Sequence, residues 1–370
     1  MRYYIIAGEA SGDLHASNFV KALTHLDNDA EIRGWGGERM QQAGVKLVHH
    51  YRETAFMGLW EVIKNIRKIS SLLAECKKDV LKFKPDIVVL VDYPGFNLRI
   101  AQWAKKNNFK TCYYISPKLW AWNEKRVHTI IKCVDLMLCI FPFEVDFYKK
   151  YNYEVKFVGH PLIDALSETN SLKVSKDKIA LLPGSRKQEI ESMAPLFALI
   201  AEKYYSEKFV LAGISSLEKK MYSKFNRKNI EIIWDDTHAV LKQSKAAIVN
   251  SGTATLEAAL FNVPQMVCYK TSKLTYAIAK RLVKVKWISP VNLVLNREAV
   301  KEFIQDDCNS GTLESELKSL LNNEVHRTNI LNDYAELKML LGGKGASMKA
   351  AKAVINFVEY GNQKLNSNIE

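Results

Sequence analysis

Several features of other protein classes are missing from this sequence. It has no run of 18 uncharged apolar residues, which argues against a membrane-spanning helix. The opening MRYYIIAGEASGD passes from a short apolar run into a Gly/Ser/Asp turn, so it predicts a first strand and not a signal peptide. The six cysteines are scattered, with no C-x-x-C pair and no histidine at ligand spacing. Reduced thiols in a cytosolic protein are therefore the simplest interpretation.

The best-known nucleotide and metal motifs are also missing. GEASGD, after the first apolar run, lacks the third glycine of G-x-G-x-x-G, so a dinucleotide fingerprint is not supported. The absence of G-x-x-x-x-G-K-[ST] disfavours nucleoside triphosphate hydrolysis. No D-x-D pair occurs in the context of metal-dependent sugar transferases, and the adjacent pairs at 235–236 and 306–307 would point apart. NAD-dependent oxidoreductases and P-loop enzymes are thus disfavoured.

What remains is the pattern of parallel α/β architecture. A chain of 370 residues exceeds the size at which one core stops growing, which predicts two domains. Short apolar runs alternate with longer segments of helical period. The expected strands are residues 2–8, 86–92, 111–116, 135–141 and 154–159, then 178–184, 208–213, 230–234, 246–250 and 264–269. Their near-continuous apolar character suits strands covered by helices on both faces.

The polar segment SETNSLKVSKD separates the two sets of strands and is the best linker candidate. We expect two Rossmann-like parallel-sheet domains, residues 1–170 and 171–340. A ligand cleft is expected between them, at the carboxyl ends of strands. The last helical pattern, within 341–370, is expected to pack back on the first domain.

The turn GEASGD can form a ligand site at a helix start. Gly8 and Gly12 allow the backbone to approach a ligand, and the helix offers free N–H groups. Ser11 or Asp13 can cap the helix. An ordinary strand-to-helix turn is the alternative.

Three more motifs follow strands of the first half. VDYPGFN places Asp92 where open α/β sheets hold catalytic groups, or simply as a helix cap, and it includes the candidate contact Asn97. SPKLWAW sets Trp120 and Trp122 beside a proline, either as core packing or as flat walls for sugars and acyl chains. GHPLID places His160 at a strand end, as a ligand contact or a structural side chain.

LLPGSRKQEI has the chemistry of a phosphate site. A strand feeds the glycine turn at Gly184 and then a helix that starts near Lys187. Ser185, Arg186 and the first free amides would converge on one spot, which fits a phosphate.

NSGTATLEAAL has the same pattern of a strand, a turn of small residues and a helix start, in a later strand–helix unit. Asn250, Ser251, Gly252 and Thr253 form a turn of small residues at a helix start. Glu257 lies one turn further, where it can accept hydrogen bonds from ribose hydroxyls or serve only the helix dipole.

Both phosphate-friendly turns lie in the second half of the chain. Asn292, in the proline-broken segment WISPVNLVLN, is a further candidate for a phosphate or sugar hydroxyl, or for a local turn. Together these residues predict a nucleoside-diphosphate pocket without a metal.

Charge points to polyanionic partners. Lysine and arginine number 53 against 40 acidic residues, a net charge of +13 that suits nucleic acid, anionic lipid or phosphorylated substrates. Two basic amphipathic stretches, 56–73 and 269–287, suit an anionic bilayer surface. A core-packing helix is the alternative for the first stretch; the second has no acidic residue. Aromatic residues are not interleaved with the basic runs, which disfavours nucleic acid.

Seven ordered motifs carry a family resemblance: GEASGD, VDYPGFN, SPKLWAW, GHPL, LLPGSRKQEI, SGTATLE and SPVNLVLNRE. With them the chain resembles the lipid-A-disaccharide synthases, inverting glycosyltransferases of the lipid A pathway in Gram-negative bacteria. The resemblance covers nearly the whole chain and implies the GT-B arrangement of two Rossmann-like domains.

The resemblance also implies a reaction. A 2,3-diacylglucosamine unit would move from UDP to the 6-hydroxyl of 2,3-diacylglucosamine 1-phosphate, giving a β-1,6 disaccharide and UDP. By motif, Asp92 would be the general base and Arg186, with Ser185 and the turn amides, would steady the leaving diphosphate. Glu257, Ser251, Thr253 and Asn292 would lie near the nucleotide.

The same resemblance sets expectations for cofactors and location. It implies no cofactor or metal, and a cytoplasmic enzyme held peripherally on the inner face of the inner membrane; a homodimer is left open. Gly95 stands where the family often has a second acid, and Lys118 where it has a small or apolar residue. The rivals are another GT-B transferase of N-acetylglucosamine, a UDP-sugar epimerase of the same fold, an oxidoreductase and a nucleic-acid-binding module.

Overall fold

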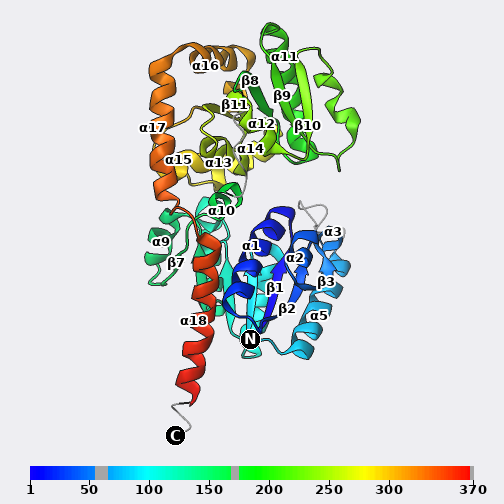
Figure 1. Cartoon of the computed structure of the whole chain (residues 1–370), viewed down its shortest axis with the longest axis vertical. Helices are drawn as coiled ribbons and strands as arrows, with labels where there is room; N and C mark the ends of the chain where they lie inside the picture. The colour runs from blue at the N-terminus through cyan, green and yellow to red at the C-terminus, as the bar shows by residue number, and fades with distance from the viewer. Residues whose placement is uncertain (55–65, 168–174, 367–370) are drawn as a thin grey trace. The chain divides into compact units, whose positions relative to one another are not determined.

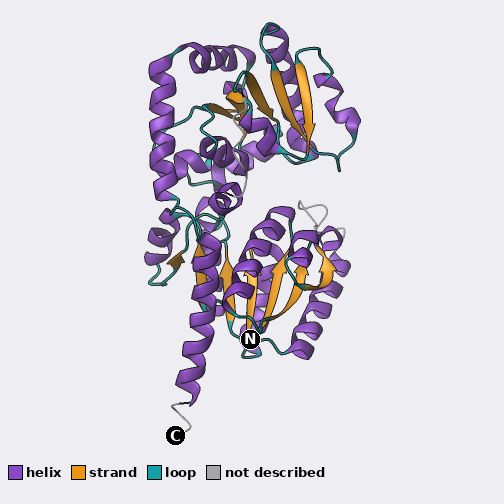
Figure 2. Cartoon of the chain, viewed as in Figure 1, coloured by secondary structure: helices purple, strands orange, loops and turns teal. Residues whose placement is uncertain are grey.

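The chain forms two compact units, each built on one parallel sheet. The computed structural model describes residues 1–54, 66–167 and 175–366. One unit comprises Met1–Thr169 with Leu341–Glu370, and the other comprises Asn170–Leu340 (Figure 1). Within each unit helices flank the strands (Figure 2). The predicted fold class, two parallel-sheet α/β domains, is confirmed.

The first unit has a seven-stranded sheet in the order β3-β2-β1-β4-β5-β6-β7. Its strands are β1 (Arg2–Ala7), β2 (Glu31–Gly36), β3 (Lys46–His50), β4 (Ile87–Val91), β5 (Thr111–Tyr114), β6 (Leu136–Cys139) and β7 (Lys156–Phe157). Its helices are α1 (Ala10–Leu26), α2 (Glu38–Gln42), α3 (Tyr51–Thr54), α5 (Ile66–Phe83), α6 (Pro94–Lys106), α7 (Leu119–Trp122), η1 (Glu124–Arg126), α8 (Val127–Cys133), α9 (Pro142–Lys149), α10 (Leu162–Ser167) and α18 (Ala346–Asn366).

The second unit has a six-stranded sheet in the order β10-β9-β8-β11-β12-β13. Its strands are β8 (Lys178–Leu182), β9 (Phe209–Gly213), β10 (Ile230–Trp234), β11 (Ser244–Asn250), β12 (Gln265–Tyr269) and β13 (Glu302–Ile304). Its helices are α11 (Lys187–Lys203), η2 (Lys219–Phe225), α12 (Thr237–Lys242), α13 (Thr253–Leu260), α14 (Lys273–Leu282), α15 (Pro290–Leu295), η3 (Gln305–Asp307), α16 (Ser310–Asn322) and α17 (Glu324–Leu340).

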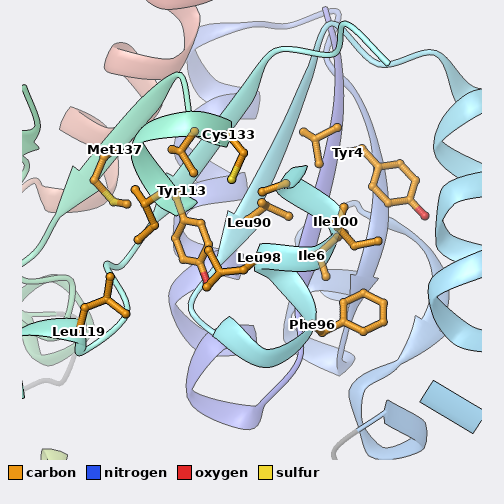
Figure 3. Packing of buried hydrophobic residues seen from close by; sticks show 14 of the residues in the cluster. Tyr4, Ile6, Leu90, Phe96, Leu98, Ile100, Tyr113, Leu119, Cys133 and Met137 are labelled. Carbon is orange, nitrogen blue, oxygen red and sulfur yellow. The ribbon is translucent and has the colours of Figure 1, made fainter. Parts of the chain in front are cut away.

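Apolar strands form because helices cover them on both faces. Every residue of β4 is buried, as are five of the six in β1. Figure 3 shows the resulting core, where side chains from β1, β4, β5 and β6 pack against α6 and α8. The last helix, α18, packs on α1, and the Asp164 carboxylate fixes its start by accepting the amides of Gly345 (2.7 Å) and Ser347 (2.9 Å).

Three strands were not predicted from the sequence. β2 contains two glycines, and a Cβ on Gly34 would collide with the Ile5 carbonyl of the neighbouring strand. β3 and β13 are edge strands with no fully buried residue. Apolar periodicity is a weak signal in such strands because the sheet needs little hydrophobic burial from them.

Strand order reverses direction at the same place in both sheets. The chain winds outward from β1 to β3 and then returns to place β4 beside β1, and the second sheet repeats this at β8 and β11. Ligands of doubly wound sheets bind at the carboxyl ends of the two strands that flank this point. Four of the predicted motifs follow β1, β4, β8 and β11, so the fold places two of them at each switch point.

Membrane-related features are partly visible. Among the described helices, none has the length and apolarity that would carry it across a bilayer. Residues 56–65 of the predicted amphipathic stretch 56–73 lie outside the described ranges, and α5 contains the rest.

Candidate active site

Asp92 directly follows β4 at the first switch point and is held in an unusual backbone conformation. Both Asp92 (φ 46°) and Tyr93 (φ 47°) are left-handed, a strained state for residues other than glycine. The Asp92 carbonyl accepts hydrogen bonds from the Tyr113 hydroxyl (2.6 Å) and the Asn97 amide nitrogen (2.8 Å). The Tyr93 ring lies where a Cβ of Gly8 would be, so a glycine is required there. The two loops of this switch point are therefore in contact.

The Asp92 carboxyl group has the electrostatic setting of a proton acceptor. Burial raises its pKa, and the nearby Lys118 ammonium and a hydrogen bond to the Tyr93 backbone oppose that shift. A base whose pKa is moved toward neutrality is better matched to accepting a proton at physiological pH.

Lys118 and Glu144 were not among the candidate site residues predicted from the sequence, and the charge of Lys118 acts on the carboxyl groups of both Asp92 and Glu144. Glu144 is 1% exposed and accepts the amides of Ile140 (3.2 Å) and Phe141 (3.1 Å). Burial raises the Glu144 pKa to about 7, and these amides and Lys118 oppose the shift. Lys118 is exposed and follows β5 at the same edge as Asp92. The sequence did contain one indication of Lys118: it lies two residues after Ser116, which ends a predicted strand.

The two indoles of SPKLWAW do not form a common wall. Trp120 donates to Glu144 Oε1 (3.2 Å) and packs edge-on against Phe143 at 4.9 Å between ring centroids. Trp122 is 52% exposed, with the Arg126 guanidinium 5.5 Å from its ring centroid. Positions two apart on a helix point to opposite sides, so the expectation of a paired flat wall is wrong.

His160 is buried and neutral. Its ring packs against Phe141 and His15, and its Nδ1 accepts the Leu162 amide (3.2 Å). Burial lowers the His160 pKa to about 3, with the charges of His15 and Lys118 adding to the effect. The structure therefore assigns His160 a packing role in place of the expected ligand contact.

The side chains of Asp13 and Asn97 are buried, and both already make hydrogen bonds to the protein backbone. The Asp13 carboxylate accepts the amides of Gly37 (2.7 Å), Met40 (3.1 Å) and Arg39 (3.2 Å), which caps α2. Asn97 is fully buried and its amide nitrogen also donates to the Val91 carbonyl (3.2 Å). Both side chains shape the site, so the expected direct contacts with substrate are corrected to structural roles.

The start of α1 keeps ligand-binding potential. Ser11 is exposed in its first turn, Gly12 is buried against Ala7, and no side chain in the described ranges caps this helix. Its first amides can therefore receive an anionic or hydroxyl group of a ligand.

The turn after β8 differs from the predicted phosphate cradle. Gly184 is left-handed (φ 117°), as a tight turn requires, and α11 begins at Lys187. However, the amides of Ser185 (2.9 Å) and Arg186 (3.2 Å) donate to Glu189 Oε2. A carboxylate thus occupies the position expected for a phosphate. The prediction of free amides is wrong here, because an acidic residue three positions into a helix can fold back on its start.

Arg186 nevertheless remains available to a ligand. Its side chain is 62% exposed, and its guanidinium lies 3.7 Å from Glu189 Oε1. A solvent-exposed pair at this separation is weak. An incoming diphosphate can therefore compete for the guanidinium.

The turn after β11 presents the open helix start. No side chain within the described residues caps α13, and a Cβ on Gly252 would meet nothing within 4 Å. Thr253 is exposed in the first turn, whereas Ser251 donates to the Ile288 carbonyl (3.0 Å). A Cβ on Gly184 would lie 3.1 Å from the Asn250 amide nitrogen, so the two turns of this switch point adjoin.

Glu257 has a partner that the sequence did not suggest. His238 Nε2 of α12 lies 3.5 Å from Glu257 Oε1, and both side chains are partly exposed at 26% and 20%. The pair therefore places an imidazole and a carboxylate side by side, and both groups can hydrogen-bond to a hydroxyl group. Across the described ranges, no three His, Cys, Asp or Glu side chains are grouped as a metal site would require.

Asn292 is a structural hub. It is fully buried, donates to the Val300 carbonyl (2.8 Å) and Glu302 Oε1 (2.9 Å), and accepts the amides of Ala299 (2.9 Å) and Val300 (3.0 Å). All four hydrogen-bonding positions of its amide are used. The expected phosphate or sugar contact is therefore corrected: Asn292 supports the loop at Ile288 that borders Ser251.

Comparison with known proteins matches this architecture. Residues 3–357 fit the profile of the lipid-A-disaccharide synthetase family. A lipid-A-disaccharide synthase of Coxiella burnetii is 36% identical over 367 residues, covering 96% of this chain and 98% of that one. Among solved structures, a UDP-GlcNAc 2-epimerase from Neisseria meningitidis (TM-score 0.67, 14% identity, 96% and 100% coverage) and a kitacinnamycin glycosyltransferase (TM-score 0.65, 13% identity, 96% and 98% coverage) share the fold. The chain therefore belongs to the lipid-A-disaccharide synthetase family, and it is a glycosyltransferase of lipid A disaccharide synthesis.

Proposed function

We propose that the protein joins UDP-2,3-diacylglucosamine to 2,3-diacylglucosamine 1-phosphate with inversion, giving the β-1,6-linked disaccharide 1-phosphate and UDP. The observation that carries the proposal is the pairing of motifs at the two switch points. One edge holds the partly buried carboxylate of Asp92, and the other holds an uncapped helix start beside an exposed arginine. Inverting transfer needs a base for the acceptor and a cationic site for the leaving group.

The donor nucleotide binds at the second sheet. Its diphosphate lies on the first amides of α13, with Arg186 as the additional cation, and the ribose hydroxyls bond to Glu257. As the bond between the anomeric carbon and the diphosphate oxygen breaks, negative charge grows on that oxygen. Fixed amides and a guanidinium stabilise this charge without reorganising.

The acceptor binds at the first sheet beside Asp92. The Asp92 carboxylate takes the proton of the acceptor 6-hydroxyl while that oxygen attacks the anomeric carbon from the face opposite the diphosphate. The left-handed backbone and its two hydrogen bonds keep the carboxylate at the sheet edge. Proton transfer of this kind contributes about 10²–10⁴-fold to rate.

Mass spectrometry of products from the two diacylated precursors tests the proposal. Wild type is expected to form the disaccharide 1-phosphate and UDP, and Asp92→Asn to lose about 10²–10⁴-fold in kcat. Asp146→Asn, an exposed acid on α9 of the same unit, serves as the control and should keep full activity. A wild type that forms no disaccharide, or that acts on UDP-N-acetylglucosamine instead, would refute the assignment.

Arg186 and metal dependence form a second test. Arg186→Gln should lower kcat by about 10²–10³-fold, as for loss of one preorganised donor. Because amides and a guanidinium balance the leaving charge, turnover should persist in a chelator. Reversible loss of turnover on chelation would overturn the metal-free mechanism.

We also propose peripheral association with the cytoplasmic face of an anionic membrane. Lys273, Lys280 and Arg281 are exposed on α14, and no acidic residue occurs in 269–287. Basic residues near an anionic surface contribute about 1 kcal/mol each. Co-sedimentation with phosphatidylglycerol vesicles should weaken with salt and in the Lys280→Gln/Arg281→Gln double variant. Equal binding to phosphatidylcholine would contradict this.

A further inference from the structure

A cavity of about 470 Å³ lies beside the first switch point, within the first unit. Its described lining comes from α5, α6, η1 and α8, and includes Tyr93, the residue after Asp92. Cavities that hold small ligands are typically about 300–1,000 Å³. This one is therefore large enough for part of a lipid substrate and adjoins the proposed base.

The charge of the cavity is of one sign. Arg99 of α6 and Arg126 of η1 line it, and none of its described lining residues is acidic. Within the described ranges Arg99 has no ion pair, and Arg126 stacks on Trp122 without a carboxylate partner. Two guanidinium groups without counter-ions in a concave site suit a phosphate, which they can bind through paired hydrogen bonds.

The remaining lining is largely apolar. Ile69 of α5 is partly buried, and Phe96 (4% exposed) and Leu98 (7%) reach into the cavity wall from the core shown in Figure 3. A Cβ on Gly95 would meet nothing within 4 Å, so the first turn of α6 is open to a ligand. An anion with an attached hydrocarbon chain satisfies both parts of this lining; a free nucleotide satisfies only the first.

We propose that this cavity binds the acceptor, with its 1-phosphate on Arg99 and Arg126 and one acyl chain against Ile69, Phe96 and Leu98. The inference rests on the proposed function, because only the acceptor combines a free phosphomonoester with acyl chains. It assigns the two arginines to substrate specificity and leaves the proton transfer to Asp92.

The phosphate arm of the test compares Arg99→Gln and Arg126→Gln with wild type. Each is expected to raise the KM for the 1-phosphate acceptor by about tenfold to a hundredfold, as for loss of a charged hydrogen bond. The KM for the donor should not change. With an acceptor that lacks the 1-phosphate, wild type and both variants should have the same KM. Arg39→Gln, an exposed arginine on α2 outside the cavity, is the matched control and should behave as wild type.

The acyl arm uses acceptors of different chain length. Each methylene buried in the cavity should tighten binding roughly fourfold. Ile69→Ser should reduce this gain, and Ile66→Ser should not, because Ile66 lies one turn earlier on α5 and is 61% exposed outside the lining. Phosphatidylglycerol micelles should compete poorly with the acceptor in wild type.

The outcomes separate this inference from the proposed function. If wild type makes no disaccharide, the proposed function fails. If wild type makes it while both arginine variants keep the wild-type KM for the 1-phosphate acceptor, the function stands and the cavity assignment is overturned. Equal losses with the phosphate-free acceptor, or phosphatidylglycerol competition as strong as the acceptor's own binding, would also overturn it. Urea unfolding of each variant should match wild type, which confirms that the folded state is being compared.

Discussion

Replacing Asn292 by alanine distinguishes a structural hub from a substrate contact. The substitution removes four hydrogen bonds, to the Val300 carbonyl, to Glu302 and from the amides of Ala299 and Val300. Each bond contributes about 0.5–1.5 kcal/mol, and a buried group left unpaired costs about 1–3 kcal/mol. We expect a loss of about 3–5 kcal/mol in the free energy of unfolding, a large share of the roughly 5–15 kcal/mol typical of a domain.

Two measurements check the Asn292→Ala prediction. Urea unfolding followed by circular dichroism gives the change in stability, and hydrogen exchange of peptides from 286–302 should report faster exchange at Ala299 and Val300. Asn322→Ala, an exposed asparagine at the end of α16, is the control and should change stability by less than about 0.5 kcal/mol. A variant as stable as wild type, with a donor KM raised tenfold, would refute the structural assignment and restore Asn292 as a ligand contact.

The other predictions concern the first unit. Asp13→Ala removes the acceptor of three amides and should cost about 2–4 kcal/mol of stability in urea unfolding; an unchanged midpoint would contradict the capping role. Lys118→Gln removes a positive charge that lowers the pKa of Asp92, so the pKa of Asp92 should rise in the variant. The acidic limb of the pH profile of kcat/KM should therefore move to higher pH. An acidic limb at the wild-type pH would count against Asp92 as the general base. The folded-state pKa of His160, about 3, lies below its unfolded value of about 6.5, so its stabilising contribution is full above pH 6.5 and is lost as pH falls toward 3. The stability advantage of wild type over His160→Asn should therefore shrink by about 1.4 kcal/mol per pH unit below 6.5, and a pH-independent difference would refute it.

Much of the fold could be predicted because its central strands are buried on both faces. The apolar runs before Gly8, Asp92, Gly184 and Asn250 identify β1, β4, β8 and β11, and helix starts follow each of them. The polar edge strands escaped prediction because they bury little. Site residues were harder to predict, because the sequence pattern of a polar side chain after a strand is the same whether that side chain binds a ligand or hydrogen-bonds to the backbone. Asp13 and Asn292 are of this kind.

The sequence alone determined two parallel sheets and the turns that end their switch-point strands. The alternation of apolar runs with helical segments, and the residues that start helices, are local properties of the chain. Only the tertiary structure decided which polar groups remain open to ligands. Glu189 folds back onto the amides after β8, α13 keeps an uncapped start, and Arg99 and Arg126 meet at one cavity from separate elements. Those outcomes depend on which groups become neighbours in space, because a hydrogen bond or a buried charge is satisfied by proximity and not by position along the chain.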